Sequence, residues 1–166
     1  MGNLSFGQGS LLATPVHIAQ MVAAVVNDGE IVRPTLLKGY VDQDGTLKES
    51  APAPGQSAFS AETAATLRDL MINAVVNGTG AGGKPFRYGA GGKTGTAETG
   101  WESDGKAVVQ SWYAGFFSDE DPKYVIAVLA EDANNTGGKS APVFKQICEE
   151  LALHEKYAEG KIENEN

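Results

Sequence analysis

Apolar residues recur at helical spacing in three stretches of the chain. The first stretch follows Thr14 and Pro15, which suit the N-cap and first turn of a helix, and it ends at Gly29. The second begins after Ser60 and the third at Ser140. We predict three amphipathic helices, whose apolar stripes are Ile18, Met21, Val22 and Val25; Leu67, Leu70, Met71 and Ala74; and Phe144, Ile147, Cys148 and Leu151.

Other stretches have the composition of β-strands. Asp44-Gly45 is a dipeptide typical of a hairpin turn, and it separates two short candidate strands. Residues 124–130 (YVIAVLA) are apolar throughout, which is typical of a strand covered on both faces. Residues 99–106 are polar and glycine-containing, and we expect a loop there. The predicted strands are residues 36–41, 46–48, 108–117 and 124–130.

The composition narrows the class of function. The 166 residues include 13 Lys and Arg against 21 Asp and Glu, a net charge of −8, which argues against nucleic acid as a partner. No apolar run reaches the roughly 18 residues that a membrane helix needs. Cys148 is the single cysteine and lies on an apolar stripe, so we expect a buried, inert thiol. His17 and His154 lie far apart; we expect His17 to be solvated, and we predict no metal or cofactor.

Two nucleotide-binding patterns match in part and are rejected. Residues 78–83 fit a dinucleotide fingerprint, but they follow a predicted helix rather than a strand. Gly92-Lys93-Thr94 and Gly138-Lys139-Ser140 resemble the end of a phosphate loop, but the first glycine of that motif is replaced by Arg87 and Ala133 respectively.

The four residues Lys93, Thr94, Gly95 and Thr96 have the chemistry of a binding strand. A lysine supplies a positive charge for a carboxylate, and a threonine hydroxyl supplies a directional hydrogen bond. A glycine lets an extended ligand approach the backbone, and an amide such as that of Thr96 can stabilise an oxyanion. Taken alone, these four residues are more typical of an exposed polar strand end than of a binding site.

Their surroundings add a family resemblance. Residues 91–98 (GGKTGTAE) follow FGQG at 6–9 and TPVHIAQM at 14–21, and they precede SWYAGFF at 111–117 and DPKYVIAV at 121–128. This ordered set resembles the C-terminal part of the transpeptidase domain of penicillin-binding proteins, over residues 4–153. The resemblance implies an α/β fold of the α+β type, a truncated β-lactamase/transpeptidase-like fold with helices packed on an antiparallel sheet.

The resemblance also implies roles for the four residues. In the intact family a serine attacks a D-Ala-D-Ala peptide bond of the cell-wall precursor, and β-lactams acylate the same serine. Lys93 and Thr94 would hold the carboxylate of the donor peptide, and Thr96 Oγ would assist. Gly95 would keep the strand surface open, and the Thr96 N–H would be one oxyanion donor. No cofactor is implied.

The sequence departs from the family at the nucleophile. Ser-x-Asn does not occur, and Ser-x-x-Lys occurs once, at Ser103 to Lys106 in the predicted loop, where we interpret it as a chance match. We therefore expect residues 1–154 to be the C-terminal portion of one transpeptidase domain, lacking its nucleophile and inactive alone. Residues 155–166 are expected to be a charged, disordered tail.

Several consequences follow from this interpretation. The expected partners are the missing N-terminal half of the domain and, in the intact parent, peptidoglycan stem peptides and β-lactams. Without that half, the edge of the strand at 124–130 would be bare, and we expect self-association through it. The family works outside the cytoplasmic membrane on an anchor that this sequence lacks. The alternatives are a non-catalytic binding or scaffold module with the same fold and, less favoured, a β-lactamase.

Overall fold

The computed structural model describes residues 11–50, 55–86, 88–118, 120–136 and 139–158. The FGQG stretch at 6–9 and the end of the tail lie outside the described residues. Within them, every helix is too short or too polar to traverse a bilayer. The elements are α1 (Pro15–Val26), β1 (Gly39–Val41), β2 (Leu47–Glu49), α2 (Ala61–Asn77), the 3₁₀ turn η2 (Ala81–Gly83), β3 (Ala90–Ser103), β4 (Lys106–Phe117), β5 (Tyr124–Ala130), α3 (Ala133–Thr136) and α4 (Ser140–Ala158).

The three long helices begin where the sequence predicts. The Thr14 hydroxyl accepts a hydrogen bond from the His17 amide at 3.2 Å, and the Ser60 hydroxyl accepts one from the Thr63 amide at 3.2 Å. Each cap satisfies an amide that has no partner within its own helix. His17 is exposed, as expected. The predicted apolar stripes are wrong at Met21 and Leu70, which are 64% and 58% exposed. After α1 the chain turns at Gly29, whose φ of 86° favours glycine.

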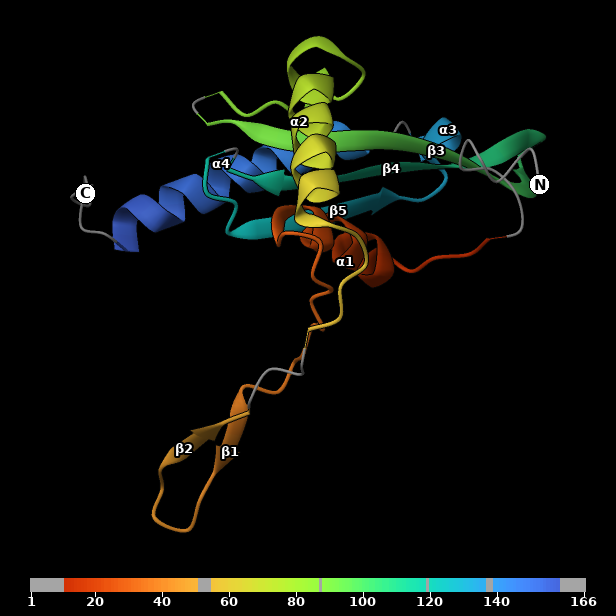
Figure 1. Ribbon diagram of the computed structural model, residues 1–166. Coiled ribbons are helices and arrows are strands. Elements are labelled where there is room, and N and C mark those ends of the chain that lie inside the picture. The colour runs from red at the N-terminus through yellow and green to blue at the C-terminus, as the bar shows by residue number, and fades with distance from the viewer. Residues whose placement is uncertain (1–10, 51–54, 87, 119, 137–138, 159–166) are drawn as a thin grey trace, which may run out of the picture.

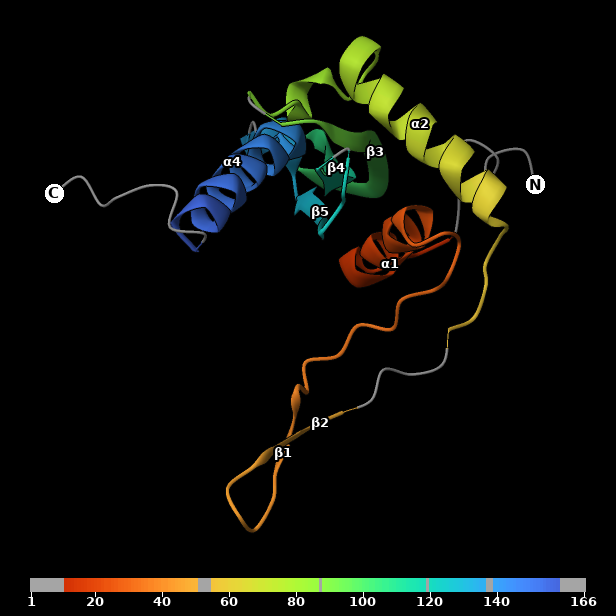
Figure 2. The ribbon, with the colours of Figure 1, turned by 60° about the vertical axis from the view of Figure 1, so that its left-hand side comes forward.

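The central sheet is antiparallel, with the strand order β3-β4-β5. Helix α4 packs against one face of it, while α1 and α2 lie on the other face (Figure 2). Among the described residues β3 and β5 are therefore the two outer strands. This arrangement of helices on an antiparallel sheet is the architecture that the sequence predicts.

The main core lies between α4 and β4. Tyr113 and Phe117 of β4 are buried against Phe144 and Cys148 of α4, and the Tyr113 and Phe144 ring centroids are 4.5 Å apart. Gly92 of β3 lies so close to the Tyr113 ring that a Cβ there would come within 2.6 Å of it. Cys148 is thus the buried packing residue that its position on the stripe predicts, and burial raises the pKa of its thiol to about 12.

The prediction of a loop at 99–106 is wrong. β3 continues to Ser103 and β4 begins at Lys106, so the two strands form one long hairpin. Asp104 and Gly105 have φ values of 52° and 72°, as a two-residue hairpin turn requires. The register shifts between Glu98 and Glu102, which marks a bulge. This end of the hairpin is largely exposed, so it lacks the apolar alternation by which a strand is recognised.

β1 and β2 form a second, separate hairpin that projects from the body of the molecule (Figure 1). We call residues 31–50 together with 55–56 the hairpin arm. Its base is fixed by two backbone hydrogen bonds of 2.8 Å, from Ile31 to Gln56 and from Ala58 to Gly29. β1 begins at Gly39 rather than at residue 36, because the Thr35 hydroxyl bonds to the Leu37 backbone and turns the chain.

Candidate ligand-binding site

The residues Lys93 to Thr96 lie in the middle of β3, as predicted. Exposure changes abruptly along this strand: residues 90–92 are buried, Lys93 and Thr96 are exposed, and Thr94 and Gly95 are half-buried. β4 pairs with one side of β3, and no other strand of the described chain pairs with the opposite side. An extended ligand could therefore lie along this edge of the sheet.

A small polar cluster surrounds Thr94. The Lys93 ammonium donates to the Thr94 carbonyl oxygen at 3.0 Å and to the Thr94 hydroxyl at 3.4 Å. The Thr94 hydroxyl in turn donates to the hydroxyl of Thr79 at 3.3 Å. One cation and two hydroxyl groups thus lie together on the exposed side of β3.

Sequence reasoning did not identify Thr79. It lies between α2 and η2, in a glycine-rich stretch that resembles a flexible loop, and it precedes Thr94 by fifteen residues. The structure shows that this segment is held in place. The amides of Gly78 and Gly80 donate to the Ala74 carbonyl at 3.1 and 2.9 Å, and the Gly80 carbonyl accepts from the buried Tyr113 hydroxyl at 2.9 Å.

Tyr113 therefore links the core to the site. Burial, and to a smaller extent the nearby Cys148, raises the pKa of Tyr113 to about 12, so its hydroxyl keeps its proton at neutral pH. A protonated hydroxyl is a donor, which is what the Gly80 carbonyl requires. The same ring lies against Gly92, just before Lys93 on β3. The two segments that carry Thr79 and Thr94 are thus braced on one side chain.

The cluster has the chemistry of an anion site. An ammonium group attracts a carboxylate as a point charge, and two adjacent hydroxyls can direct hydrogen bonds to its oxygens. The sequence predicted Lys93 and Thr94 for this role, and the structure places them next to each other with Thr79 as a third polar group. Their binding of a carboxylate remains a prediction.

The residues of the isolated Ser-x-x-Lys match lie elsewhere. Ser103 and Lys106 face each other across the β3–β4 turn, so no helix holds them together. Ser103 comes ten residues after Lys93 on the same strand, which is roughly 30 Å of extended chain. The described part of the chain also has no group of His, Cys, Asp and Glu side chains that could hold a metal ion.

The comparisons of the sequence and of the fold with known proteins agree on one protein family. Residues 2–149 match the model of the penicillin binding protein transpeptidase domain, so the chain belongs to that family. It is 34% identical over 160 residues to the peptidoglycan D,D-transpeptidase PbpA of Mycolicibacterium smegmatis, covering 93% of this chain and 32% of that protein. It is 31% identical over 152 residues to stage V sporulation protein D of Bacillus subtilis, covering 86% and 23%.

Solved structures of the family have the same fold. Penicillin binding protein 3 of Mycobacterium tuberculosis in complex with aztreonam superposes with a TM-score of 0.79 at 30% identity, over 93% of this chain and 38% of that one. Its ampicillin complex also gives a TM-score of 0.79. These neighbours confirm the predicted fold class, which is that of the β-lactamase-like transpeptidase domains. The chain spans about a third or less of the length of these curated relatives, 32% and 23%.

Proposed function

We propose that this chain is the carboxylate-binding part of a peptidoglycan D,D-transpeptidase whose serine nucleophile lies outside this sequence. The supporting observation is the cluster of the Lys93 ammonium with the Thr94 and Thr79 hydroxyls on an outer strand of a transpeptidase-family sheet. A cation beside hydroxyls is suited to the terminal carboxylate of a D-Ala-D-Ala peptide.

Each residue of the strand has a place in this proposal. Lys93 and Thr94 bind the terminal carboxylate, with help from the hydroxyl of Thr96, and the peptide extends the sheet alongside β3. Gly95 leaves the strand surface open. The Thr96 N–H donates to the oxyanion that forms when the serine attacks the D-Ala-D-Ala bond. The aztreonam and ampicillin complexes of one related protein support β-lactams as ligands of the complete enzyme.

Two partly exposed apolar surfaces support the proposal that this chain is part of a larger protein. The seven residues of β5 are aliphatic or aromatic, a composition that suits a strand covered on both faces. Each of them is nevertheless only half-buried. The outer side of α4 carries an apolar groove lined by Val143, Ile147 and Leu151, among others. In this proposal the remainder of the transpeptidase domain covers both surfaces. The complete protein acts outside the cytoplasmic membrane, held there by an anchor.

The carboxylate site can be tested on the chain itself. We expect diacetyl-L-lysyl-D-alanyl-D-alanine to shift the NMR signals of Lys93 to Thr96, and the same peptide with an amidated C-terminus to shift them much less. The two peptides differ mainly in the negative charge of the C-terminal carboxylate. Equal shifts from both peptides would therefore exclude a carboxylate site. Absence of any shift at millimolar concentration would exclude binding to this strand.

The place of the nucleophile needs a second experiment. We expect a fluorescent penicillin to leave this chain unlabelled, since a β-lactam forms its adduct on an activated serine. Mass spectrometry would locate any adduct, and one on Ser103 would contradict the proposal. The complete reading frame distinguishes an enzyme from the alternative, a non-catalytic binding or scaffold module. Ser-x-x-Lys and Ser-x-Asn motifs ahead of this segment would support an enzyme, and their absence there would support the non-catalytic module.

A further inference from the structure

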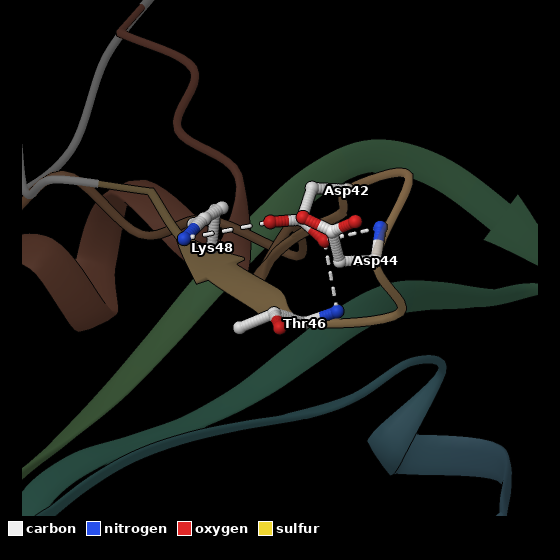
Figure 3. A network of polar contacts seen from close by, with 4 residues as sticks. All are labelled: Asp42, Asp44, Thr46 and Lys48. Carbon is white, nitrogen blue, oxygen red and sulfur yellow. Dashed lines mark hydrogen bonds and ion pairs between the residues drawn. The ribbon is translucent and has the colours of Figure 1, made fainter.

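The tip of the hairpin arm is held by its own polar contacts. One carboxylate oxygen of Asp42 accepts hydrogen bonds from the amides of Asp44 and Thr46 at 3.0 and 2.9 Å, and the other lies 3.4 Å from the Lys48 ammonium (Figure 3). A backbone bond from Asp42 to Thr46 closes the turn at 3.0 Å. The sequence therefore specifies this hairpin locally, yet a two-stranded hairpin is marginally stable without further packing.

The two faces of the arm differ in character. The register pairs Tyr40 with Lys48 and Val41 with Leu47. Since side chains alternate along a strand, the Asp42–Lys48 ion pair lies on the face of Tyr40, and Val41 and Leu47 lie together on the other. Glu49 follows on the face of Leu47 at the base of the hairpin, 3.7 Å from the Lys38 ammonium. Val41 is 65% exposed and Leu47 is 43% exposed. Leu36 and Leu37, at the base of the hairpin, are exposed as well.

Such an arrangement is typical of a sheet that packs on one side. Antiparallel sheets commonly turn an ionic face to water and an apolar face to a core. In the arm the Asp42–Lys48 ion pair occupies one face, and the apolar pair Val41–Leu47 on the other face, toward the tip from Glu49, is largely uncovered within the described chain. Contiguous exposed apolar side chains of this kind mark contact surfaces.

The direction of the arm indicates what covers it. Figures 1 and 2 both show the arm extending past β5, on the side of the sheet opposite β3. The bare edge of β5 lies on this same side. The backbone bonds at residues 29–31 and 56–58 fix the base of the arm to the junction of α1 and α2. Material added to the sheet beyond β5 would therefore lie next to the arm.

The relatives have enough additional chain to supply that material. This chain covers 32% of one curated transpeptidase and 38% of a solved one. We propose that the apolar face of the arm, Val41 and Leu47, packs on the portion of the same polypeptide that extends the sheet beyond β5. The arm then clasps the two parts of the molecule. This inference rests on the proposed function, which makes the chain one part of a longer transpeptidase.

Paired substitutions test the clasp in two contexts. The double variant Val41→Ser/Leu47→Ser removes the apolar pair, and Tyr40→Ser is its control on the opposite face, where Tyr40 is 66% exposed. In the product of the complete reading frame, we expect the double variant to lower the unfolding midpoint by about 4 °C or more. We expect Tyr40→Ser to leave that midpoint unchanged. In this chain alone, both variants should melt like the parent sequence.

Hydrogen exchange provides a second readout that does not depend on a destabilised variant. The amides of β1 and β2 should be protected in the complete protein and exchange faster in this chain alone. The clasp would be overturned if, in the complete protein, the double variant melted like the parent sequence and the amides of β1 and β2 exchanged as fast as they do in this chain alone. A concentration-dependent association of this chain that the double variant abolishes would overturn it in favour of a second copy.

The two proposals can fail separately. If the complete protein is labelled by a fluorescent penicillin while the arm variants melt normally, the clasp is wrong and the proposed function stands. If the complete protein is not labelled, or the reading frame adds no further domain, the proposed function fails.

Discussion

The hydroxyl of Thr79 shares a hydrogen bond of 3.3 Å with that of Thr94, the residue proposed to bind the carboxylate. Removing it with Thr79→Val leaves the Thr94 hydroxyl free to rotate away from the ligand. One such hydrogen bond contributes about 0.5–1.5 kcal/mol, so we expect the dissociation constant for a D-Ala-D-Ala peptide to rise roughly 2–10-fold. NMR titration of the chain measures it.

Two variants separate positioning from general damage. Thr79→Ser keeps the hydroxyl and should restore most of the affinity. Thr66→Val removes an exposed hydroxyl on α2, which bonds to the Glu62 carbonyl at 3.0 Å away from the site, and should have no effect on binding. A loss of affinity with Thr66→Val as large as that with Thr79→Val would contradict a local role for Thr79.

Tyr113 gives a prediction about stability at the same scale. Tyr113→Phe keeps the ring contacts but leaves the Gly80 carbonyl without the donor that now lies 2.9 Å away. A buried polar group left without a partner costs about 1–3 kcal/mol, and chemical denaturation should show that loss. Tyr40→Phe is the matched control, because Tyr40 is exposed and its loss of a hydroxyl should leave the midpoint unchanged. Equal midpoints for the two variants would contradict this bracing role.

Among the elements, those with local signals were predictable. The caps Thr14 and Ser60 and the apolar stripes identified α1, α2 and α4, and the aromatic and apolar runs identified β4 and β5. The outer half of the β3–β4 hairpin was missed because its stability comes from pairing across strands, such as Glu102 with Ala107, rather than from a buried face. Thr79 was missed for a related reason: only the fold brings it to Thr94.

The packing of α4 on β4 buries two groups that ionise at alkaline pH, so the stability of the fold should decrease there. Burial raises the pKa of Cys148 from 9.0 to about 12 and that of Tyr113 from 10.0 to about 12. The unfolded chain ionises first, so the stability that these two neutral groups contribute is fully present below about pH 9 and is lost as the pH rises towards 12. Denaturant midpoints measured from pH 7 to 11 test this sign.

The variant Cys148→Ala isolates the thiol contribution. It removes buried volume and should lower stability at every pH, but the decline should then begin near pH 10, where Tyr113 ionises in the unfolded chain. Alkylation of the folded chain at pH 8 should also be slow, since Cys148 is buried and protonated. Rapid alkylation, or a decline in the variant that still begins at pH 9, would contradict this account.

At the scale of the whole molecule, the bare edge of β5 predicts how the chain behaves alone. Every residue from Tyr124 to Ala130 is half-buried rather than buried, and the outer edge of this apolar strand is unpaired within the described structure. Unpaired amides and carbonyls on an apolar edge are a template for pairing with a second copy. We expect sedimentation velocity to show a dimer that forms as concentration rises. Ala127→Lys, which places a charge in the strand, should suppress it.

Matched variants decide which surface is responsible. Leu70→Lys alters an apolar residue of α2 that is 58% exposed. It should leave the dimer intact, because we attribute dimerisation to the edge of β5 and not to nonspecific contacts between exposed apolar side chains. Val41→Ser/Leu47→Ser should leave it intact too, since the arm is proposed to pack on the missing part of the same polypeptide. A compact monomer at all concentrations would show that the edge of β5 stays solvated instead of pairing with a second copy, and would contradict the prediction. In the longer transpeptidase that we propose, further chain would pair with this edge, and the dimer is therefore expected to disappear.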